Sequence, residues 1–470
     1  MYKSAIGLKE RIHFIGIGGI GMSGLAQVMS TIGFRVQGSD LVLSKNIERC
    51  KKIGIKVFSD HSKSNIKNCT IIVKSSAIKN NNPEIQAAKN KGLRILKRSE
   101  MLAHVVSLKK NIIITGSHGK TTTTSLISRI FSEAGLDPTI INGGVINSTN
   151  SSAKLGKGNW AVLEADESDG SFLNLPIDYS VVTNIDIEHI DFYKSFKNLK
   201  KAFIRFLDNT PGIGKSFVCV DNKELKNVLQ KVKNKNYFTY GFSKSSNFKI
   251  VKAVYRKNFS IFDLKISIPG ETIKIIKNIK LNLIGKYNVL NSVAAIGLCL
   301  HIGIKLKVIK DTLKKFTGIQ RRLTKVFEIN KKEFFDDYAH HPTEIKSVLD
   351  SIKINSGKRK IISVFQPHRY SRVKLLKNEF ASSFKNADIV VLCPVYSAGE
   401  KIDKKYNEIN FARLISKNSE AQVLIVKNEM NLKNFFIKNL IKDEIVVCMG
   451  AGSISKWLRD MNFKNEKKYI

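Results

Sequence analysis

One short stretch constrains this chain more than any other, the segment from Asn111 to Ser125, which reads NIIITGSHGKTTTTS. Its apolar and β-branched residues 112–115 predict a buried parallel strand, and Lys120 with the threonines after it predicts the start of a helix. A tight glycine-containing turn between a strand and a helix directs backbone N–H groups at an anion, and the helix N-terminus adds partial positive charge. The pattern therefore indicates a phosphate-binding loop.

The residue types of this loop suit a nucleoside triphosphate with magnesium. Lys120 would reach the β- and γ-phosphates, and the Thr121 hydroxyl would bind Mg²⁺. The loop is shorter than a full Walker A sequence, because Ile114 stands five positions before Gly119 where that sequence has glycine. An ordinary strand–helix turn is the alternative. We interpret the segment as an ATP-binding core with these candidate residues: Gly116, Ser117, His118, Gly119, Lys120, Thr121 and Thr122.

Length and composition predict a multidomain protein without membrane segments. At roughly 100–200 residues per domain, 470 residues suggest about three domains. No apolar run reaches the roughly 18 residues of a transmembrane helix, so we expect no membrane insertion. The six cysteines are far apart, which suits free thiols in a reducing cytoplasm and argues against zinc. The net charge of +40 is dispersed along the chain, so we expect no specific nucleic acid partner.

A second glycine-rich turn is predicted in residues 11–24, which read RIHFIGIGGIGMSG. A strand, three glycines in G-x-G-x-x-G spacing and a helix are typical of a turn that admits a diphosphate. The strand of residues 35–39 then ends at Asp40, at the distance expected of an acid that binds a ribose. The pattern fits NAD, FAD or a nucleotide sugar equally. Its candidate residues are Gly16, Gly18, Gly21 and Asp40.

Two acidic segments follow the phosphate loop along the chain. The predicted strand 161–163 delivers Glu164 and Asp166 at its carboxyl end, where ligands bind in parallel sheets, so Glu164 is the expected Mg²⁺ ligand. A solvated turn is the alternative. The predicted strand 179–185 runs into DIEHIDFY, in which acids flank His189. This histidine could contact a metal or a phosphate, although a lone histidine is more often structural.

A helix predicted to start at about Asn288 carries two amides on one face. The strand before it is expected to stop at Gly285, and Asn288 and Asn291 are three residues apart. Amide side chains can pair with a purine edge or cap a helix, and the spacing leaves both readings open.

The last third of the chain repeats the pattern of strands that end in polar residues. The segment 334–342, FFDDYAHHP, predicts a strand ending in acids, a tyrosine and histidines. The segment 358–372, KRKIISVFQPHRYSR, predicts another, with Arg369 and Arg372 at a helix start, where they suit a phosphate or a carboxylate. Two further strands, each followed by a helix, complete a second doubly wound domain.

Taken in order, these motifs resemble the Mur ligases of bacterial cell-wall synthesis. The resemblance runs from about Ile12 to Gly452 and rests on eleven motifs: HFIGIGGIGMSGLA, GSD, TGSHGKTTTT, EADESDGSF, TNIDIEHIDFY, YNVLNSVAA, RR, DDYAHHPTEI, FQPHRYSR, YSAGE and MGAG. It departs from the family pattern at Ser117, at Glu188 and in the Leu-Thr pair after Arg322. None of these departures removes a group that the chemistry requires.

The resemblance implies an α/β fold with three domains. Residues 1–106 would form a Rossmann-like domain that binds a UDP substrate, so the first glycine-rich turn would hold a UDP diphosphate and not NAD. Residues 107–318 would form the central P-loop-type ATPase domain with a parallel sheet, and residues 319–470 a Rossmann-like ligase domain. Lys97 to Glu100 would begin the exit from the first domain.

The resemblance also implies roles for individual residues. The metal set would be Thr121, Glu164 and His189, beside Lys120 at the phosphates. Asn288 would contact adenine. Arg322 and Asp337 would reach the nucleotide from the third domain. The muramyl nucleotide would be faced by Tyr338, His340, Arg369 and Arg372, with His340 a candidate acceptor for the amine proton.

The reaction implied is the ATP- and Mg²⁺-dependent joining of L-alanine to the lactyl carboxylate of UDP-N-acetylmuramate through an acyl phosphate. Three rivals remain: a recycling ligase that attaches a whole tripeptide to the same nucleotide, an NAD-dependent oxidoreductase, and a nucleic-acid binder. We expect a cytoplasmic monomer or weak homodimer.

Overall fold

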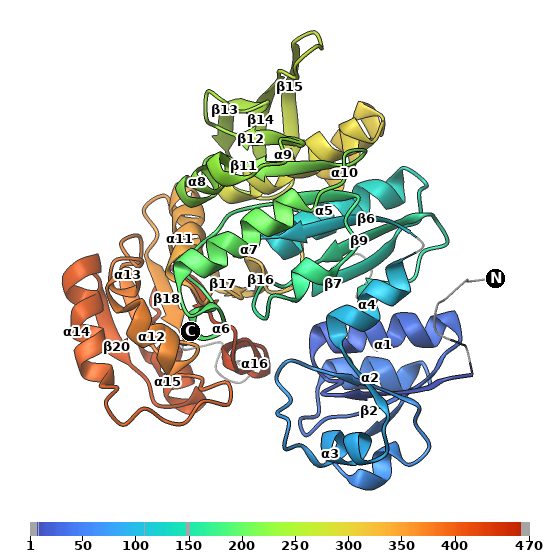
Figure 1. Cartoon of the computed structure of the whole chain (residues 1–470). Coiled ribbons are helices and arrows are strands. Elements are labelled where there is room, and N and C mark those ends of the chain that lie inside the picture. Colours follow the sequence, from blue (N-terminus) through green and yellow to red (C-terminus); the bar gives the residue numbers. More distant parts are fainter. Residues whose placement is uncertain (1–6, 8, 108, 147–150, 462–470) are drawn as a thin grey trace. The chain divides into compact units, whose positions relative to one another are not determined.

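The computed structural model describes residues 7, 9–107, 109–146 and 151–461, and three β-sheets with flanking helices confirm the α/β class (Figure 1). The described chain forms two compact units. The first comprises residues up to 253 with 261–282 and 288–317, and the second comprises 254–260, 283–287 and residues from 318 onward. The domain bounds expected near residues 106 and 318 stay predictions.

The N-terminal sheet has five parallel strands in the order β3-β2-β1-β4-β5. Its strands are β1 (Arg11–Ile15), β2 (Arg35–Ser39), β3 (Lys56–Phe58), β4 (Ile71–Lys74) and β5 (Arg94–Lys97). Its helices are α1 (Ile20–Ile32), α2 (Lys45–Lys52), the 3₁₀ turn η1 (Lys63–Ile66), α3 (Pro83–Asn90) and α4 (Arg98–Val106). The strand order reverses at β1, so the β1–α1 turn with its glycines lies at a topological switch point, where such sheets bind ligands.

The central sheet has ten strands in the order β15-β14-β13-β12-β11-β10-β6-β9-β7-β8. These are β6 (Lys110–Thr115), β7 (Thr139–Ile146), β8 (Ser151–Lys154), β9 (Trp160–Glu164), β10 (Tyr179–Val182), β11 (Lys215–Cys219), β12 (Tyr237–Gly241), β13 (Phe248–Tyr255), β14 (Ser260–Ile266) and β15 (Lys274–Leu281). The strand β6 pairs in parallel with β9 on one side and β10 on the other. The segments that follow these three strands therefore meet at one edge of the sheet.

The helices of this part are α5 (Lys120–Glu133), the 3₁₀ turn η2 (Ser171–Asn174), α6 (Ile190–Tyr193), α7 (Phe196–Asp208), α8 (Lys223–Lys231), α9 (Lys286–His301) and α10 (Leu306–Lys315). Several predicted element bounds differ from the structure by a few residues. The strand β15 ends at Leu281 and not at Gly285, and α9 begins two residues before Asn288. The strand β10 ends at Val182 and not at residue 185, because the Asn184 carbonyl turns to the Ser117 N–H of the phosphate loop (3.1 Å).

The C-terminal sheet has six strands in the order β16-β17-β21-β18-β19-β20, parallel except for the β16–β17 hairpin. Its strands are β16 (Thr324–Ile329), β17 (Lys332–Asp337), β18 (Ile361–Phe365), β19 (Ile389–Leu392), β20 (Gln422–Ile425) and β21 (Ile445–Met449). Its helices are α11 (Pro342–Ser356), α12 (Tyr370–Leu375), α13 (Lys377–Ala381), α14 (Glu408–Ser419), α15 (Glu429–Asn439) and α16 (Ile454–Asp460).

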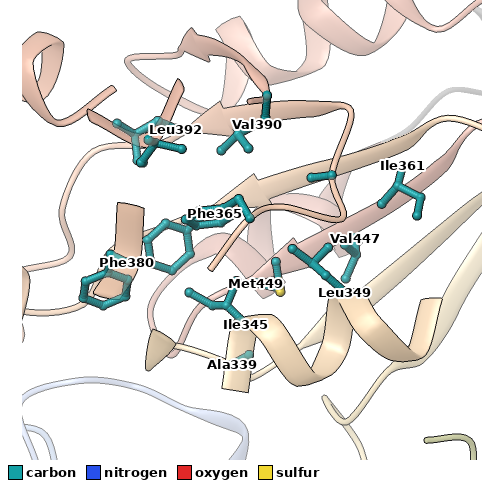
Figure 2. Packing of buried hydrophobic residues seen from close by; sticks show 14 of the residues in the cluster. Ala339, Ile345, Leu349, Ile361, Phe365, Phe380, Val390, Leu392, Val447 and Met449 are labelled. Carbon is teal, nitrogen blue, oxygen red and sulfur yellow. The ribbon is translucent and has the colours of Figure 1, made fainter. Parts of the chain in front are cut away.

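Apolar side chains bury both faces of this last sheet. On one face Phe365 packs with Phe380, Leu349 and Met449 (Figure 2). The other face has its own buried cluster around Phe334 and Phe436. The strands of a parallel sheet covered on both faces are continuous apolar runs in the sequence. For this reason these strands could be predicted from the sequence.

Two expectations from composition can be compared with the structure. All six cysteines are free and buried. Within the described ranges, no helix combines the length and the hydropathy needed to cross a bilayer.

Candidate active site

The phosphate loop joins β6 to α5, and its lysine is engaged by a carboxylate. The Lys120 ammonium donates to both Glu167 oxygens (3.1 and 2.9 Å) and to the Gly116 carbonyl oxygen (2.6 Å). Burial lowers the pKa of Lys120, but Glu167, Asp166 and Glu164 outweigh burial and hold the pKa above its ordinary value. The ammonium is therefore charged and is surrounded by carboxylates. A phosphate could replace Glu167 as the partner of the ammonium, and a metal ion could replace the ammonium as the partner of Glu167.

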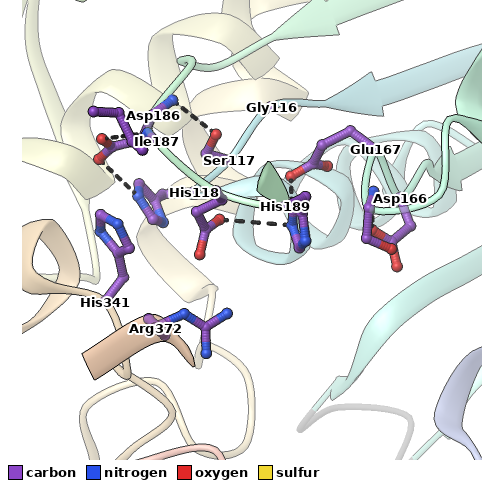
Figure 3. Close-up of polar contacts among 12 residues, drawn as sticks. Gly116, Ser117, His118, Asp166, Glu167, Asp186, Ile187, His189, His341 and Arg372 are labelled. Atoms are coloured by element: carbon purple, nitrogen blue, oxygen red, sulfur yellow. Dashed lines mark hydrogen bonds and ion pairs between the residues drawn. The ribbon is translucent and has the colours of Figure 1, made fainter. Parts of the chain in front are cut away.

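Glu167 also contacts His189 (Figure 3), so this carboxylate joins Lys120 to the histidine. The His189 Nε2 lies 3.6 Å from a Glu167 oxygen, and the Tyr193 hydroxyl donates to the Glu167 carbonyl oxygen (2.5 Å). Glu167 is fully buried; burial raises its pKa, but Lys120 and His189 hold the pKa below its usual value. Burial lowers the pKa of His189, and Glu167 more than offsets burial and raises it. These three groups form one coupled charge cluster.

The structure divides the predicted metal set into two neighbouring groups. The Thr121 hydroxyl donates to Glu164 (3.1 Å), whose other oxygen accepts the Gly143 N–H (2.6 Å). His189 instead joins Asp166 and Glu167, and one ligand atom from each of these three lies within 4.8 Å of the others. Hydroxyl and carboxylate oxygens are the ligands that Mg²⁺ prefers, so the donor chemistry fits that ion.

The segment after β10 braces the phosphate loop. The Asn184 side chain accepts the His118 N–H (2.9 Å) and donates to the His118 carbonyl (3.0 Å). The Thr183 hydroxyl donates to the same carbonyl (2.6 Å), and the Asp186 N–H donates to the Ser117 hydroxyl (2.9 Å). Asp186 also faces the His118 ring at 3.1 Å (Figure 3).

This bracing limits which backbone groups can meet a phosphate. The N–H groups of Ser117 and His118 are bonded to Asn184. The first N–H groups of α5, from Lys120 onward, have no partner within the helix and carry its positive end. The anion-binding donors of the loop are thus concentrated at the start of α5, next to the Lys120 ammonium and the Thr121 hydroxyl.

Of the two amides on α9, the structure brings Asn291 against the phosphate loop. Gly119 has φ +82°, and a Cβ there would lie 2.6 Å from the Asn291 oxygen, so only glycine fits. Asn288 is half-buried one turn earlier, and its expected contact with adenine stays a prediction.

The glycines of the N-terminal turn serve three different ends. Gly16 has φ +81°, which favours glycine. Gly18 makes room for Asp40, whose carboxylate accepts the Gly18 N–H (2.8 Å) and the Val42 N–H (3.0 Å). Asp40 thus fixes the turn, and its expected contact with a ribose stays a prediction. Gly21 makes room for the side chain of Arg98.

In the second unit, Asp337 is buried between arginine and main chain. Its oxygens accept the N–H groups of Leu323 and Ala339, both at 2.7 Å. Burial raises the pKa of Asp337 to about 6, although Arg322 opposes the rise. The Arg322 guanidinium lies over the Tyr338 ring, 5.4 Å from its centroid. The structure therefore brings three predicted residues of the third segment together.

The predicted histidine of this unit lies beside a second histidine and an arginine. The His340 ring is 5.5 Å from that of His368, and Arg372 contacts His368 Nδ1 (3.0 Å). Burial lowers the pKa of His340 well below its ordinary value and that of His368 to about 4. Arg369 caps α12 with φ +69°, and its N–H donates to the Tyr396 carbonyl (2.8 Å).

Three family models match most of the chain between residues 11 and 452. The Mur ligase catalytic domain matches residues 11–110, the Mur ligase middle domain 114–299, and the glutamate ligase domain of Mur ligases 321–452. The chain belongs to the Mur ligase family. The UDP-N-acetylmuramate–L-alanine ligase of Pelagibacter ubique is 54% identical over 96% of this chain and 97% of its own length. The ligase of the same name from Rickettsia prowazekii is 41% identical over 96% and 92%.

Solved Mur ligases share the fold. The crystal structure of UDP-N-acetylmuramate–alanine ligase from Thermotoga maritima is 26% identical, covers 96% of this chain and 97% of that one, and has a TM-score of 0.80. A murein peptide ligase from Psychrobacter arcticus has a TM-score of 0.72 at 21% identity, over 96% and 99% of the two chains. At this level of identity, the similarity to the murein peptide ligase supports only a shared fold.

Two residues of this Mur ligase site were not singled out as candidates from the sequence: Glu167 and Asn184. Glu167 lies 47 positions from Lys120, and Asn184 lies 66 positions from His118, so neither pair shows as a local pattern. The signal that could have found Glu167 is its place in the acidic run EADESD, where Glu164 and Asp166 were singled out instead.

Proposed function

We propose that this Mur ligase joins L-alanine to the lactyl carboxylate of UDP-N-acetylmuramate with consumption of ATP. The products are UDP-N-acetylmuramoyl-L-alanine, ADP and phosphate, in the synthesis of peptidoglycan precursors. The observation that carries the proposal is the 54% identity, over nearly the full length of both chains, to the ligase of that name. The motif EADESDGSF, read as favouring the alanine-adding member, agrees with it.

The phosphate loop supports the first half of the reaction. A carboxylate oxygen attacks the γ-phosphorus of ATP, and both reactants are anions that must be held in line against their repulsion. Lys120 offers a charged ammonium next to the free N–H groups of α5, so the γ-phosphate meets positive charge as negative charge shifts to ADP. The product of this step is an acyl phosphate.

The acidic loops support magnesium binding. Thr121 with Glu164, and Asp166 with Glu167 and His189, would hold the ion or ions beside the phosphate loop. Bound there, Mg²⁺ would supply positive charge to the phosphates. Glu167 would then face a cation besides the ammonium, and Lys120 would be available to the γ-phosphate. This metal assignment is part of the proposal.

The second unit offers a base for the second half of the reaction, attack by the L-alanine amine on the acyl carbon. His340 Nδ1 lies 3.0 Å from the Tyr338 carbonyl oxygen, which can only accept, so the ring proton is on Nδ1 and Nε2 is open to a proton. The lowered pKa keeps His340 neutral near pH 7. We assign it as the acceptor of the amine proton; the tetrahedral intermediate then collapses and releases phosphate.

The rival functions predict different substrates. The recycling ligase would attach a whole tripeptide to the same nucleotide, and an oxidoreductase would bind a nicotinamide at the first glycine-rich turn. The family assignment and the second phosphate-binding loop disfavour the oxidoreductase. The cytoplasmic location stays an expectation.

The test is phosphate release from ATP with UDP-N-acetylmuramate across a panel of amino acids and the tripeptide. We expect release with L-alanine, a product that gains one alanyl residue in mass, and near-complete loss in Lys120→Ala. Release with the tripeptide and not with L-alanine would favour the recycling reaction. No release with either acceptor would contradict both.

A further inference from the structure

Arg98, the first residue of α4, lies against the N-terminal glycine-rich turn. Its Nη1 is 2.9 Å and its Cζ 3.3 Å from the point that a Cβ at Gly21 would occupy. The side chain is half-buried. Within the described part of the chain, its guanidinium has neither a hydrogen bond nor an ion pair, although the turn beside it is crowded with polar contacts. The donors of this half-buried guanidinium are therefore available to a ligand at the turn.

The backbone donors of the turn concentrate next to this guanidinium. The N–H groups of Gly16 and Ile17 donate to the Ser39 carbonyl, and the Gly18 N–H donates to Asp40. The Gly19 N–H donates within the turn, and Gly19 caps α1 without a side-chain bond. The donors left for an anion are those of the first turn of α1, residues 20–22, and Gly21 is the middle one.

The local charge balance also calls for a cation. Asp40 places a carboxylate on the turn that is proposed to hold a diphosphate, and two anions at one turn repel each other. A guanidinium next to Gly21 offsets this repulsion and can bind phosphate oxygens in a bidentate way, which an ammonium cannot do.

We propose that Arg98 is a substrate-binding residue that grips the diphosphate of the UDP moiety over the first turn of α1. The assignment rests on the proposed function, which places a UDP-linked substrate at this turn. In this assignment the Arg98 side chain binds the phosphates beside the glycine-rich turn. Part of the affinity for the nucleotide then comes from a residue of α4 and not from the turn itself.

The test compares the binding of UDP and of uridine, which carries the base and ribose but no phosphate, to the full-length wild type and to Arg98→Ala. Hydrogen bonds to charged groups are strong, so we expect UDP to bind about 10- to 100-fold more weakly to the variant. Uridine binding and ATP binding should be unchanged. Lys97→Ala, which removes the exposed neighbouring cation, is the matched control and should bind UDP like the wild type.

Arg98→Lys separates charge from geometry and replaces Arg98→Ala if that variant does not fold. It keeps the charge but loses the bidentate contact, so UDP affinity should fall between those of wild type and Arg98→Ala. Wild-type affinity of the arginine variants for UDP, or an equal loss for uridine and UDP, would overturn the assignment. A wild type that binds ATP but no UDP would instead contradict the proposed function, and the Arg98 assignment with it.

Discussion

At the scale of single residues, the site is governed by the buried Lys120–Glu167 pair. Both Glu167 oxygens contact the ammonium, and the side chain of Glu167 has no solvent exposure. Two opposite charges at this distance attract each other strongly. A nucleotide must therefore compete with Glu167 for the Lys120 ammonium unless a cation binds the Glu167 carboxylate. Glu167 therefore couples metal binding to the availability of Lys120.

This coupling predicts opposite effects of Glu167→Gln on binding and on turnover. Without magnesium, the variant should bind ATP about 10-fold more tightly, because the ammonium is released and one negative charge next to the phosphates is gone. With magnesium, turnover should fall, because a carboxylate of the acidic loop is missing. Nucleotide titration in EDTA and in magnesium measures both, with Glu133→Gln at the exposed end of α5 as the control. Weaker ATP binding in EDTA would contradict the coupling.

The raised pKa of Asp337 predicts a pH-dependent stability. The native carboxyl stays protonated up to about pH 6, whereas the unfolded one ionises near 3.8. The native state binds more protons between these values, so stability falls as pH rises through this window, by about 3 kcal/mol in total. The side chain of Asp337→Asn cannot ionise, so this variant should not lose that part of its stability as the pH rises.

The unfolding midpoint of the wild type should therefore fall relative to that of Asp337→Asn between pH 4 and pH 7. The exposed Asp460→Asn on α16 is the control, and its midpoint should follow the wild type. Parallel pH profiles of the unfolding midpoint for wild type and Asp337→Asn would show that ionisation of the buried Asp337 carboxyl does not lower stability.

The same residues show what sequence reasoning could reach. Lys120, Thr121 and Glu164 could be singled out as candidates because a strand end and a helix start fix their positions locally. Glu167 was missed because its role depends on a side chain 47 positions away. The structure shows Asp40 bonded to the main chain of its own turn, a contact that spacing alone did not predict.

At the scale of elements, three neighbouring strands assemble the nucleotide side of the site. β9, β6 and β10 run in parallel and deliver the acidic loop, the phosphate loop and the bracing segment 183–186 to one edge. The apolar, β-branched runs revealed that these strands exist. Their order in the sheet could not be predicted, since it depends on pairings between segments far apart in the chain. The end of β10 differed from the prediction because the Asn184 carbonyl bonds to the phosphate loop.

The brace from β10 predicts a specific kinetic defect in Asn184→Ala. Loss of the two bonds to His118 should raise the KM for ATP about 10-fold or more and lower kcat, because the loop no longer holds the start of α5 in place. Asn184→Asp keeps one acceptor and should be less impaired. UDP binding should be unchanged in both.

Asn222→Ala is the matched control for this defect. Asn222 also bonds the same segment, at Ile185, but its main contact caps α8. Loss of this cap should lower the free energy of unfolding by about 1 kcal/mol and leave the KM for ATP unchanged. An equal rise in KM for both variants would mean that Asn184 acts through general stability alone.

At the scale of the whole molecule, we propose that two glycine-rich turns bind two different nucleotides. One follows β1 in the five-stranded sheet and the other follows β6 in the ten-stranded sheet, and each precedes a helix with an uncapped N-terminus. The sequence predicted the α/β class and both turns, because each is a local strand–turn–helix unit. The division into three sheets of five, ten and six strands required the structure.

The central claim is that ATP activates the lactyl carboxylate as an acyl phosphate. The direct test uses UDP-N-acetylmuramate labelled with ¹⁸O in that carboxylate, with ATP, magnesium and L-alanine. When the amine displaces the acyl phosphate, the carboxylate oxygen that attacked phosphorus leaves with the phosphate. We expect one ¹⁸O atom in each phosphate released from fully labelled substrate. Unlabelled phosphate, or formation of AMP and pyrophosphate, would contradict activation as an acyl phosphate.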